Sequence, residues 1–578
     1  PLVQRGPDSG AIFFDSMLAF GHRRLAIIDL SERANQPMVD DSLKLAIVFN
    51  GTIYNYPELR EELKARGYSF FSDGDTEVIL KAYHAWGEQC VEKLRGMFAF
   101  AIWDMQKRIM FLARDRFGIK PLYYTRTSNY FRFASNMQSL MVAGDIDTNI
   151  DPIALHHQFT LHASVPAPYT ILSGVRKLTP AYTMTISADG KITEKNYWQL
   201  HARRDRQLSE AGWIEALRAK LVETVDRHRI IADVPVGILL SGGLDSSLLV
   251  GLLAEKDVHN LRTFSIGFED VPEEKGDEFE FSDQVAAKFG TQHRRIRLNN
   301  SQVIDRLPEA IANMSEPMVS QDVIGFYLLS EQVAKEVKVV QSGQGADEVF
   351  GGYFWYPLMD AESGTSLEKF RKHYFDRSHE EFLRIVTARY HGGDYTSNLI
   401  EKLLNAPYSD SFIDSVLRMD ATTLIVDDPV KRVDNMTMAW GLEARVPFLD
   451  HELVELASAM PPELKLKSEG KHALKVIARG ILPDPVIDRK KGYFPVPALK
   501  FVRGKLLDLT SDVLNSQACI NRNLFDRNYV NALLAAPEQH FTPLQGSKLW
   551  HLAVLEYWLQ INVDNPVASV PSPREGGK

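Results

Sequence analysis

The sequence is poor in cysteine and has no long apolar run, and each shortage excludes a class of protein. Cys90 and Cys519 are its only cysteines. Two thiols cannot build a disulfide framework or a four-thiolate metal site, which favours a reducing cytoplasm. No apolar run approaches the roughly 18 residues of a membrane-spanning helix, and no signal-peptide pattern is visible. The sequence therefore predicts a cytoplasmic protein without a membrane segment.

A strong excess of one charge is also missing. The chain has 66 basic and 75 acidic residues, a net charge of −9. This balance argues against a general binder of nucleic acid or of an anionic membrane. The apolar content of 45% and the charged content of 24% are ordinary for a globular protein. A chain of 578 residues is too long for one core, so we expect at least two domains.

The clearest chemical signal lies in residues 236–247. Residues 236–240 are an unbroken apolar run, which indicates a parallel strand buried on both faces. The run ends in Ser-Gly-Gly-Leu-Asp-Ser-Ser, residues 241–247. Gly242 and Gly243 let the backbone approach a ligand, and an apolar helix follows whose N-terminus can bind an anion. Asp245 beside phosphates requires a divalent cation between the negative charges.

A plain strand-to-helix turn with Ser and Asp caps is the alternative for this loop. Two glycines, three hydroxyls and one carboxylate within seven residues favour a phosphate site. The loop resembles the pyrophosphate-binding loop of ATP pyrophosphatases, which implies cleavage of ATP between its α and β phosphates. The ATP contacts then expected in this region are Leu240, Ser241, Gly242, Gly243, Asp245 and Ser246.

A second buried run, residues 337–341, leads into residues 342–348, another Gly-rich turn with carboxylates. Strand signals alternate here with helix signals, such as residues 303–314 and 327–335. This alternation predicts a doubly wound parallel sheet with ligands at the carboxyl ends of its strands. Two such turns at one sheet edge can face a single nucleotide, although a capped helix start is the alternative for the second turn alone. The additional residues expected at this site are Ile266, Ser342 and Gly343 for ATP, and Asp347 with Asp245 for Mg²⁺.

The first 200 residues group short strands with strands and helices with helices, which suggests an α+β layered domain. Within it, the side chain of Asn50 and the N–H of Gly51 can form an oxyanion hole. An Asn-Gly pair alone is more often a turn. The predicted strands are residues 12–14, 17–20, 43–49, 97–103 and 108–113, and the predicted helices include residues 57–66 and a segment with Val78, Ile79, Ala82 and Tyr83 on one face.

Several motifs in this region have the order and spacing of the glutaminase domain of class II glutamine amidotransferases. They are Arg5-Gly6-Pro7-Asp8, His22-Arg23-Arg24-Leu25, Asn50-Gly51, Asp73-Gly74-Asp75, residues 96–101 and residues 114–123. The resemblance implies an N-terminal-nucleophile fold, an αββα sandwich. It assigns Arg24 to the α-carboxylate of glutamine, Asp75 to its α-amino group, and Asn50 with the Gly51 N–H to the tetrahedral oxyanion.

Two positions depart from that family. Its nucleophile is a cysteine some tens of residues before Arg-Gly-Pro-Asp, whereas only residues 1–4 precede this motif here. Cys90 is not a substitute for this nucleophile, because it closes an amphipathic helix and is typical of a small buried thiol. We therefore expect the natural chain to begin earlier. The second departure is Thr52, where asparagine synthetases usually carry Glu, so part of the glutamine contact differs.

The rest of the chain supplies domain boundaries and one more catalytic candidate. Residues 201–210 are polar and predict a linker between domains at 1–200 and 211–565, and residues 566–578 predict a disordered tail. In residues 488–497 a basic cluster lies beside an aromatic residue and two prolines, which suits a lysine held over a phosphate. By resemblance, Lys491 stabilises negative charge as an adenylate forms.

Together both halves resemble the glutamine-hydrolysing asparagine synthetase family over nearly the whole chain. This resemblance implies a glutaminase domain followed by an ATP pyrophosphatase domain. Such a ligase uses ATP and Mg²⁺ to convert a carboxylate into an acyl-adenylate, and amidates it with ammonia that reaches it from glutamine through a tunnel at the domain interface. The expected partners are glutamine, ATP and a carboxylate substrate, without nucleic acid or membrane, and a homodimer is left open.

Gln344 separates the hypotheses for the acceptor, because asparagine synthetases carry Glu at this position. Residues 314–320, 340–347, 427–434 and 491–497 look most like N-acetylglutaminylglutamine amidotransferases, which amidate an acetylated dipeptide to give a neutral osmoprotectant. A neutral Gln344 fits an acceptor whose reacting carboxylate has an amide beside it. The alternatives are an asparagine synthetase, an enzyme that cyclises its own adenylate as β-lactam synthetases do, and a glutaminase-dead binding or regulatory protein.

Overall fold

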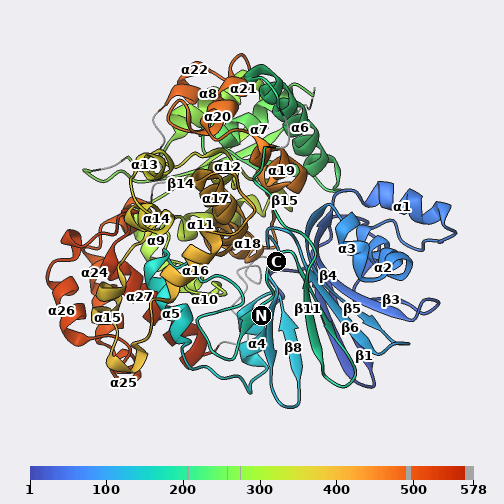
Figure 1. Cartoon of the computed structure of the whole chain (residues 1–578), viewed down its shortest axis with the longest axis horizontal. Coiled ribbons are helices and arrows are strands. Elements are labelled where there is room, and N and C mark those ends of the chain that lie inside the picture. The colour runs from blue at the N-terminus through green and yellow to red at the C-terminus, as the bar shows by residue number, and fades with distance from the viewer. Residues whose placement is uncertain are drawn as a thin grey trace.

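The chain folds into an antiparallel N-terminal domain, blue to teal in Figure 1, and a parallel α/β C-terminal domain, green to red. This computed structural model describes residues 1–204, 207–256, 258, 260–273, 275–489, 492 and 496–566. None of the helices within these ranges is long and apolar enough to span a bilayer. The predicted fold class, an antiparallel sandwich followed by a doubly wound parallel sheet, is confirmed.

The N-terminal domain is built on a six-stranded antiparallel sheet in the order β11-β10-β6-β5-β4-β3. Its central strands are apolar on both faces because both faces are covered by other layers. The strands are β3 (Met38–Asp40), β4 (Leu45–Ile53), β5 (Gly96–Asp104), β6 (Ile109–Arg114), β10 (Tyr182–Ile186) and β11 (Ile192–Asn196).

Different layers cover the two faces of this sheet. Helices α1, α2 and α3 pack on one face, at the right of Figure 1, and the β1–β2 hairpin with the small sheet β8-β7-β9 packs on the other. Helix α4 packs against β7 and β8. These elements are β1 (Ser9–Asp15), β2 (Leu18–Arg24), α1 (Tyr56–Ala65), α2 (Asp75–Trp86), α3 (Cys90–Lys93), β7 (Tyr123–Arg126), β8 (Phe131–Ala134), α4 (Met137–Val142) and β9 (Arg176–Lys177). Helix α5 (Pro152–Thr160) instead packs against helices of the C-terminal domain.

The C-terminal domain contains a five-stranded parallel sheet in the order β14-β13-β12-β15-β16. The chain first adds β13 and β14 on one side of β12, and then adds β15 and β16 on the other side. The strand order therefore reverses between β12 and β15, which is where open α/β sheets bind ligands. The strands are β12 (Val236–Leu239), β13 (Arg262–Phe268), β14 (Gln292–Leu298), β15 (Val339–Gln341) and β16 (Glu443–Arg445).

Helices cover both faces of the parallel sheet, so the side chains of β12 divide between two cores. Ile238 and Leu240 pack with α6, α7, α19 and α21, whereas Leu239 packs with α10, α11, α18 and α27. These helices are α6 (Glu210–Ile230), α7 (Leu244–Ala254), α10 (Leu307–Ala312), α11 (Asp322–Val333), α18 (Lys431–Met438), α19 (His451–Ala459), α21 (His472–Ala478) and α27 (Lys548–Leu559).

Shorter helices surround this framework, and five of them, α8 (Phe279–Phe289), α12 (Ala346–Phe350), α13 (Trp355–Ala361), α14 (Ser366–Tyr374) and α22 (Asp484–Asp488), contribute residues to the cavity described below. The others are α15 (His379–Ile385), α16 (Tyr395–Leu404), α17 (Phe412–Met419), α20 (Glu463–Leu466), α24 (Lys505–Asn515), α25 (Gln517–Arg522) and α26 (Arg527–Ala535).

One predicted helix, residues 303–314, is wrong as a single element. The structure divides it into α9 (Asn300–Asp305) and α10 (Leu307–Ala312), with Arg306 between them. Pro308 lies in the first turn of α10, where its missing N–H costs nothing, whereas within a continuous helix it would break the hydrogen-bond ladder. The apolar periodicity therefore predicted helical structure correctly, but the proline divides it into two helices.

Residues 201–204 of the proposed linker lie against the C-terminal domain. Ala202 is buried, its N–H donates to the carbonyl of Tyr408 at 2.8 Å, and its carbonyl accepts from Asp410 N at 3.1 Å. The side chain of Arg204 pairs with Asp414 at 2.7 Å. Residues 567–578 of the predicted tail, and Lys491, lie outside the described residues.

Buried polar contacts join the two domains. Asp434 of α18 pairs with Arg5 at 2.9 Å and with Lys120 at 3.2 Å, and the N–H of Asp29 donates to Asp233 at 2.7 Å. Ile27 and Ile28 also pack on Val339 of β15. Because removing one partner leaves the other charge buried without compensation, these contacts fix how the two domains meet.

Candidate functional site

The first Gly-rich loop connects β12 to α7 at the carboxyl edge of the sheet. Its tight turn uses Gly242 with φ +78°. The hydroxyl of Ser246 accepts from Ser241 N at 3.2 Å and lies 3.1 Å from Ser241 Oγ. The N-cap of α7 is Gly243, which has no side chain to cap the helix. Both hydroxyls and the first N–H groups of an eleven-residue helix are therefore directed to one place, an arrangement suited to phosphate.

The second Gly-rich loop follows β15 and lies directly against the first. A Cβ on Gly343 would lie 3.0 Å from Asp245 Cβ and 3.1 Å from Ser246 N. Gly345 takes φ +92° as the chain turns into α12, which begins at Ala346. Because neither loop leaves space for an additional side chain at this contact, the two loops form one surface.

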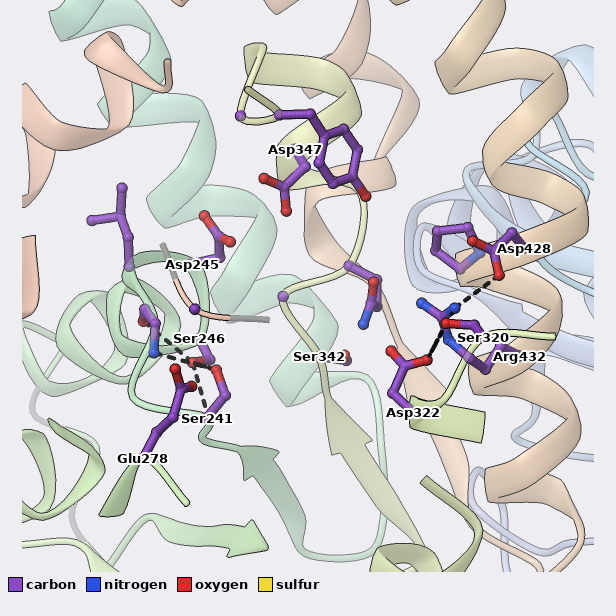
Figure 2. Close-up of a pocket in the computed structure, with 18 of the residues that line it drawn as sticks. Ser241, Asp245, Ser246, Glu278, Ser320, Asp322, Ser342, Asp347, Asp428 and Arg432 are labelled. Atoms are coloured by element: carbon purple, nitrogen blue, oxygen red, sulfur yellow. Dashed lines mark hydrogen bonds and ion pairs between the residues drawn. The ribbon is translucent and has the colours of Figure 1, made fainter. Parts of the chain in front are cut away.

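The two loops line a cavity of about 580 Å³, which Figure 2 shows in close-up. Glu278 and the Ser241–Ser246 pair lie at one end of the view, and Asp322, Asp428 and Arg432 lie at the other. Gly242 forms the turn behind this surface and is not among the lining residues. Of the residues predicted from the sequence, those that line it are Leu240, Ser241, Gly243, Asp245, Ser246, Ile266, Ser342, Gly343, Gln344 and Asp347.

Lys471 connects the two loops, although no sequence motif predicts this role for it. Its Nζ lies 2.6 Å from Asp245 Oδ2 and 2.7 Å from Asp347 Oδ1. Burial disfavours its charge, but the two carboxylates outweigh burial and hold the Lys471 pKa well above its ordinary value. The only sequence signal was a Gly-Lys pair before an apolar helix. The lysine predicted for this role, Lys491, lies outside the described residues.

Asp245 and Asp347 suit a hard divalent cation. Each places one carboxylate oxygen within hydrogen-bond distance of the same Lys471 nitrogen, so the two oxygens converge on one point from separate loops. Mg²⁺ is bound in this way in many nucleotide sites, by one or two carboxylates together with phosphate oxygens. The donor set therefore fits Mg²⁺ bound beside a polyphosphate.

The far end of the cavity is shaped by an irregular helix. Two π-helical turns, Asp420–Leu424 and Val426–Val430, interrupt the path from α17 to α18, and the second contains Pro429. Single turns of this kind recur at functional sites. They direct Asp420 and Asp428 into the cavity.

Carboxylates surround the guanidinium of Arg432 in this part of the cavity. Arg432 pairs with Asp428 at 2.8 Å and with Asp322 at 3.2 Å, as Figure 2 shows. Burial raises the pKa values of Glu348 and Asp420, and neighbouring carboxylates raise them further. The stacked rings of Tyr353 and Trp355, 4.2 Å apart, lie in the same wall. This end is acidic and aromatic, and its arginine is already neutralised.

A second cavity of about 290 Å³ lies in the N-terminal domain and is lined by Arg24, Asn50, Gly51 and Asp75. Gly51 on β4 has φ +145°, and a Cβ there would lie 2.0 Å from the carbonyl oxygen of Met97. Only glycine permits this close approach of β4 and β5, which sets the direction of its N–H. The structure thus brings together the four residues predicted to contact glutamine.

Asp75 and Arg24 are both buried in this cavity. Asp75 begins α2 and accepts a hydrogen bond from Ile53 N at 3.0 Å. Burial raises the pKa of Asp75 to about 7, against a smaller lowering by that hydrogen bond. The guanidinium of Arg24 donates to the carbonyls of Ser31 at 2.9 Å and Ile28 at 3.2 Å. These backbone contacts hold the arginine in place.

Glu443, which the sequence analysis did not assign to either site, also lines this N-terminal cavity. It belongs to β16 of the other domain and accepts a hydrogen bond from Thr52 Oγ1 at 3.0 Å. No local sequence pattern could have predicted a contact between residues 391 positions apart. Cys90, by contrast, is fully buried at the start of α3, and burial raises the pKa of its thiol.

Two protein-family models match the chain. A glutamine amidotransferase domain matches residues 1–198, and asparagine synthase matches residues 216–560.

Relatives extend over nearly the whole chain. It is 36% identical over 602 residues to glutamine-hydrolysing asparagine synthetase 1 of Bacillus subtilis (strain 168), covering 97% of this chain and 93% of that protein. It is 30% identical over 598 residues to asparagine synthetase 3 of the same organism, with coverages of 97% and 94%. Amidase chry2 of Gibberella zeae is 26% identical over 605 residues, with coverages of 91% and 88%.

The two adjacent glycines of the first loop provide a matched test of its geometry. At Gly242 the backbone is left-handed and a Cβ would lie 2.6 Å from Ser282 N, whereas at Gly243 φ is −75° and the nearest atom is the flexible Ser241 Oγ at 3.3 Å. We expect Gly242→Ala to lower the free energy of unfolding by about 1–3 kcal/mol. Gly243→Ala should change it by less than about 1 kcal/mol. Equal melting temperatures of the two variants would contradict this geometry.

Proposed function

The chain belongs to the glutamine-hydrolysing asparagine synthetase family, and from this premise we propose that it amidates the C-terminal carboxylate of N-acetylglutaminylglutamine. The family membership makes the chain an ATP-dependent carbon–nitrogen ligase that takes its nitrogen from glutamine. The acceptor, the residue roles and the metal are our proposal. A cytoplasmic location is part of it, because both cysteines are free and buried thiols.

The proposal for the acceptor rests on the acidic and aromatic character of the far end of the large cavity. Aspartate brings a second carboxylate, which needs a cation, but Arg432 is already paired with Asp322 and Asp428. An acetylated dipeptide has no charge besides the reacting carboxylate. It instead offers amide N–H groups that can donate to the carboxylates of the cavity, and apolar surface that Tyr353 and Trp355 can cover. Gln344 in the second loop adds no charge beside the reacting group.

Adenylation requires that negative charge be stabilised as the acceptor carboxylate attacks the α-phosphorus and pyrophosphate leaves. Ser241, Ser246 and the N-terminus of α7 donate hydrogen bonds to the phosphates. Lys471, kept charged by Asp245 and Asp347, would stabilise the negative charge that develops on pyrophosphate. Mg²⁺ held by Asp245 and Asp347 would supply further charge neutralisation when bound.

In the N-terminal cavity, hydrolysis of glutamine requires orientation of the substrate and stabilisation of an oxyanion. Asn50 and the Gly51 N–H provide two donors side by side on β4 for the oxygen of the tetrahedral intermediate. Arg24 offers a cation to the α-carboxylate, and ionised Asp75 offers an anion to the α-ammonium group. The ammonia released is proposed to cross the domain interface, where it is kept from the water that would protonate it.

A second candidate acceptor is aspartate, because two relatives at 36% and 30% identity are named asparagine synthetases. The choice between the two acceptors rests on the charge at the far end of the cavity.

The acceptor is tested by assaying AMP release with ATP, Mg²⁺ and ammonia, which bypasses the glutaminase. We expect kcat/KM for N-acetylglutaminylglutamine to exceed that for aspartate by about 100-fold or more, since an unpaired buried charge costs several kcal/mol. Gln344→Glu should reduce activity with the dipeptide, with Gln344→Asn as the size control. A preference for aspartate would contradict the proposed dipeptide acceptor and indicate an asparagine synthetase.

Replacing Lys471 tests the proposed adenylation site. Lys471→Met keeps the length of the side chain but leaves Asp245 and Asp347 without their ammonium partner. We expect kcat for acceptor-dependent AMP formation to fall about 100- to 1,000-fold, as on loss of a transition-state charge partner. Lys475→Met, which removes another lysine of the same cavity wall, should keep more activity. A Lys471→Met enzyme with normal kcat would remove this lysine from the mechanism.

The raised pKa of Asp75 predicts that glutamine binding depends on pH. An acid with a pKa of about 7 is mostly neutral at pH 6 and ionised at pH 8, and only the ionised form attracts an ammonium group. We therefore expect Kd for glutamine, measured by calorimetry, to be about tenfold higher at pH 6 than at pH 8. Asp75→Asn should bind weakly and with no such change. A wild-type Kd constant over this range would disprove the role of Asp75.

A further inference from the structure

We propose that Glu443, a residue of the C-terminal domain, binds the α-ammonium group of glutamine in the cavity of the N-terminal domain. The proposal rests on the glutaminase function proposed above and adds a glutamine contact from outside the N-terminal domain. The proposal is supported by the position of the Glu443 side chain and by the groups that hold one of its oxygens. The chemistry of the cavity wall to which Glu443 contributes supports it as well.

One carboxylate oxygen of Glu443 is fixed by donors from both domains. Oε1 accepts from Thr52 Oγ1 at 3.0 Å and from Arg445 Nε at 2.9 Å. Arg445 is itself anchored, because its Nη1 donates to the carbonyls of His228 at 2.8 Å and Ile231 at 2.7 Å. The side chain of Arg445 is fully buried. A guanidinium with this many partners holds Glu443 in one orientation.

The other oxygen of Glu443 is available to a ligand. Within the described part of the chain no donor forms a hydrogen bond to Oε2, and Lys120 Nζ lies 4.0 Å from it. Glu443 is only 5% exposed and lines the cavity together with Arg24 and Asp75. A buried carboxylate is costly unless a donor or cation satisfies it. An oxygen in this position therefore suits a cationic ligand inside the cavity.

Glu443 and Asp75 form the acidic side of a site for an amino acid. The raised pKa of Asp75 has burial as its main cause and the charge of Glu443 as a further one, so the two carboxylates are close enough to influence each other. Two carboxylates facing one cavity create a potential that favours an ammonium group. Arg24 supplies the opposite charge for the α-carboxylate. The cavity thus presents both charges that a zwitterionic amino acid needs.

The contact makes the glutamine site depend on how the domains meet. Thr52 lies on β4 beside Asn50 and Gly51, whereas Glu443 arrives on β16, the edge strand of the parallel sheet. The carbonyl of Arg445 on the same strand accepts from Ser342 N at 2.9 Å in the second Gly-rich loop. One three-residue strand therefore touches both sites, and glutamine binds fully only when the domains are docked.

Calorimetry with two ligands tests the proposal without requiring turnover. Glutamine is compared with 4-carbamoylbutanoate, which is glutamine without its α-ammonium group. We expect wild type to bind glutamine at least about tenfold more tightly than this analogue, and Glu443→Gln to lose about tenfold of glutamine affinity while binding the analogue unchanged. Thr52→Val, which removes one of the two donors to Oε1, should cause a smaller loss of the same kind.

Asp450→Asn is the matched control. Asp450 is an equally buried carboxylate of the same domain, but it pairs with Arg227 and His228 of its own domain and does not line the cavity. This variant should leave the ratio of the two affinities as in wild type. If Glu443→Gln weakens both ligands by the same factor, Glu443 is only an interface residue and the inference is wrong. If wild type binds no glutamine, the proposed glutaminase function itself fails.

Discussion

The ion pairs of Lys471 with Asp245 and Asp347 are the interaction on which the synthetase site depends. The two aspartates lie on loops about a hundred residues apart in the chain, and each loop begins where a buried parallel strand ends. Two carboxylates facing one small volume would repel each other. The buried ammonium at 2.6 and 2.7 Å compensates both charges and allows the two loops to lie against each other.

The second constraint is the docking of the domains, because it decides where the N-terminal cavity lies relative to the second Gly-rich loop. Buried charges as well as apolar surface form this interface. Asp434 joins Arg5 and Lys120, and Glu443 joins Thr52 and Arg445. Since truncating one partner of such a network leaves the other charge uncompensated, only one relative placement of the domains is favoured. That placement puts β16 between the glutamine cavity and the second Gly-rich loop.

Much of this arrangement could be predicted from residues close together in the sequence. The apolar runs before residues 241 and 342 predicted β12 and β15 because buried parallel strands have no polar alternation. The glycines that follow them predicted tight turns, and both loops line the cavity. Local reasoning failed where a single residue overrode a pattern, as when Pro308 divided one predicted helix into two. It also could not select Lys471 among the basic residues of the C-terminal domain, since an ammonium between two carboxylates leaves no periodic signal.

The sequence by itself determined the order of strands and helices, the two Gly-rich loops, and the side-chain types available to bind ATP and glutamine. These features depend on neighbouring residues and on the geometry of the backbone. Only the tertiary structure decided which charges meet. It paired Arg432 with Asp322 and Asp428, placed Lys471 between two loops, and brought Glu443 to Thr52 across the domain interface. Electrostatic interactions depend on distance in space and on burial, and neither is encoded in the spacing of residues along the chain.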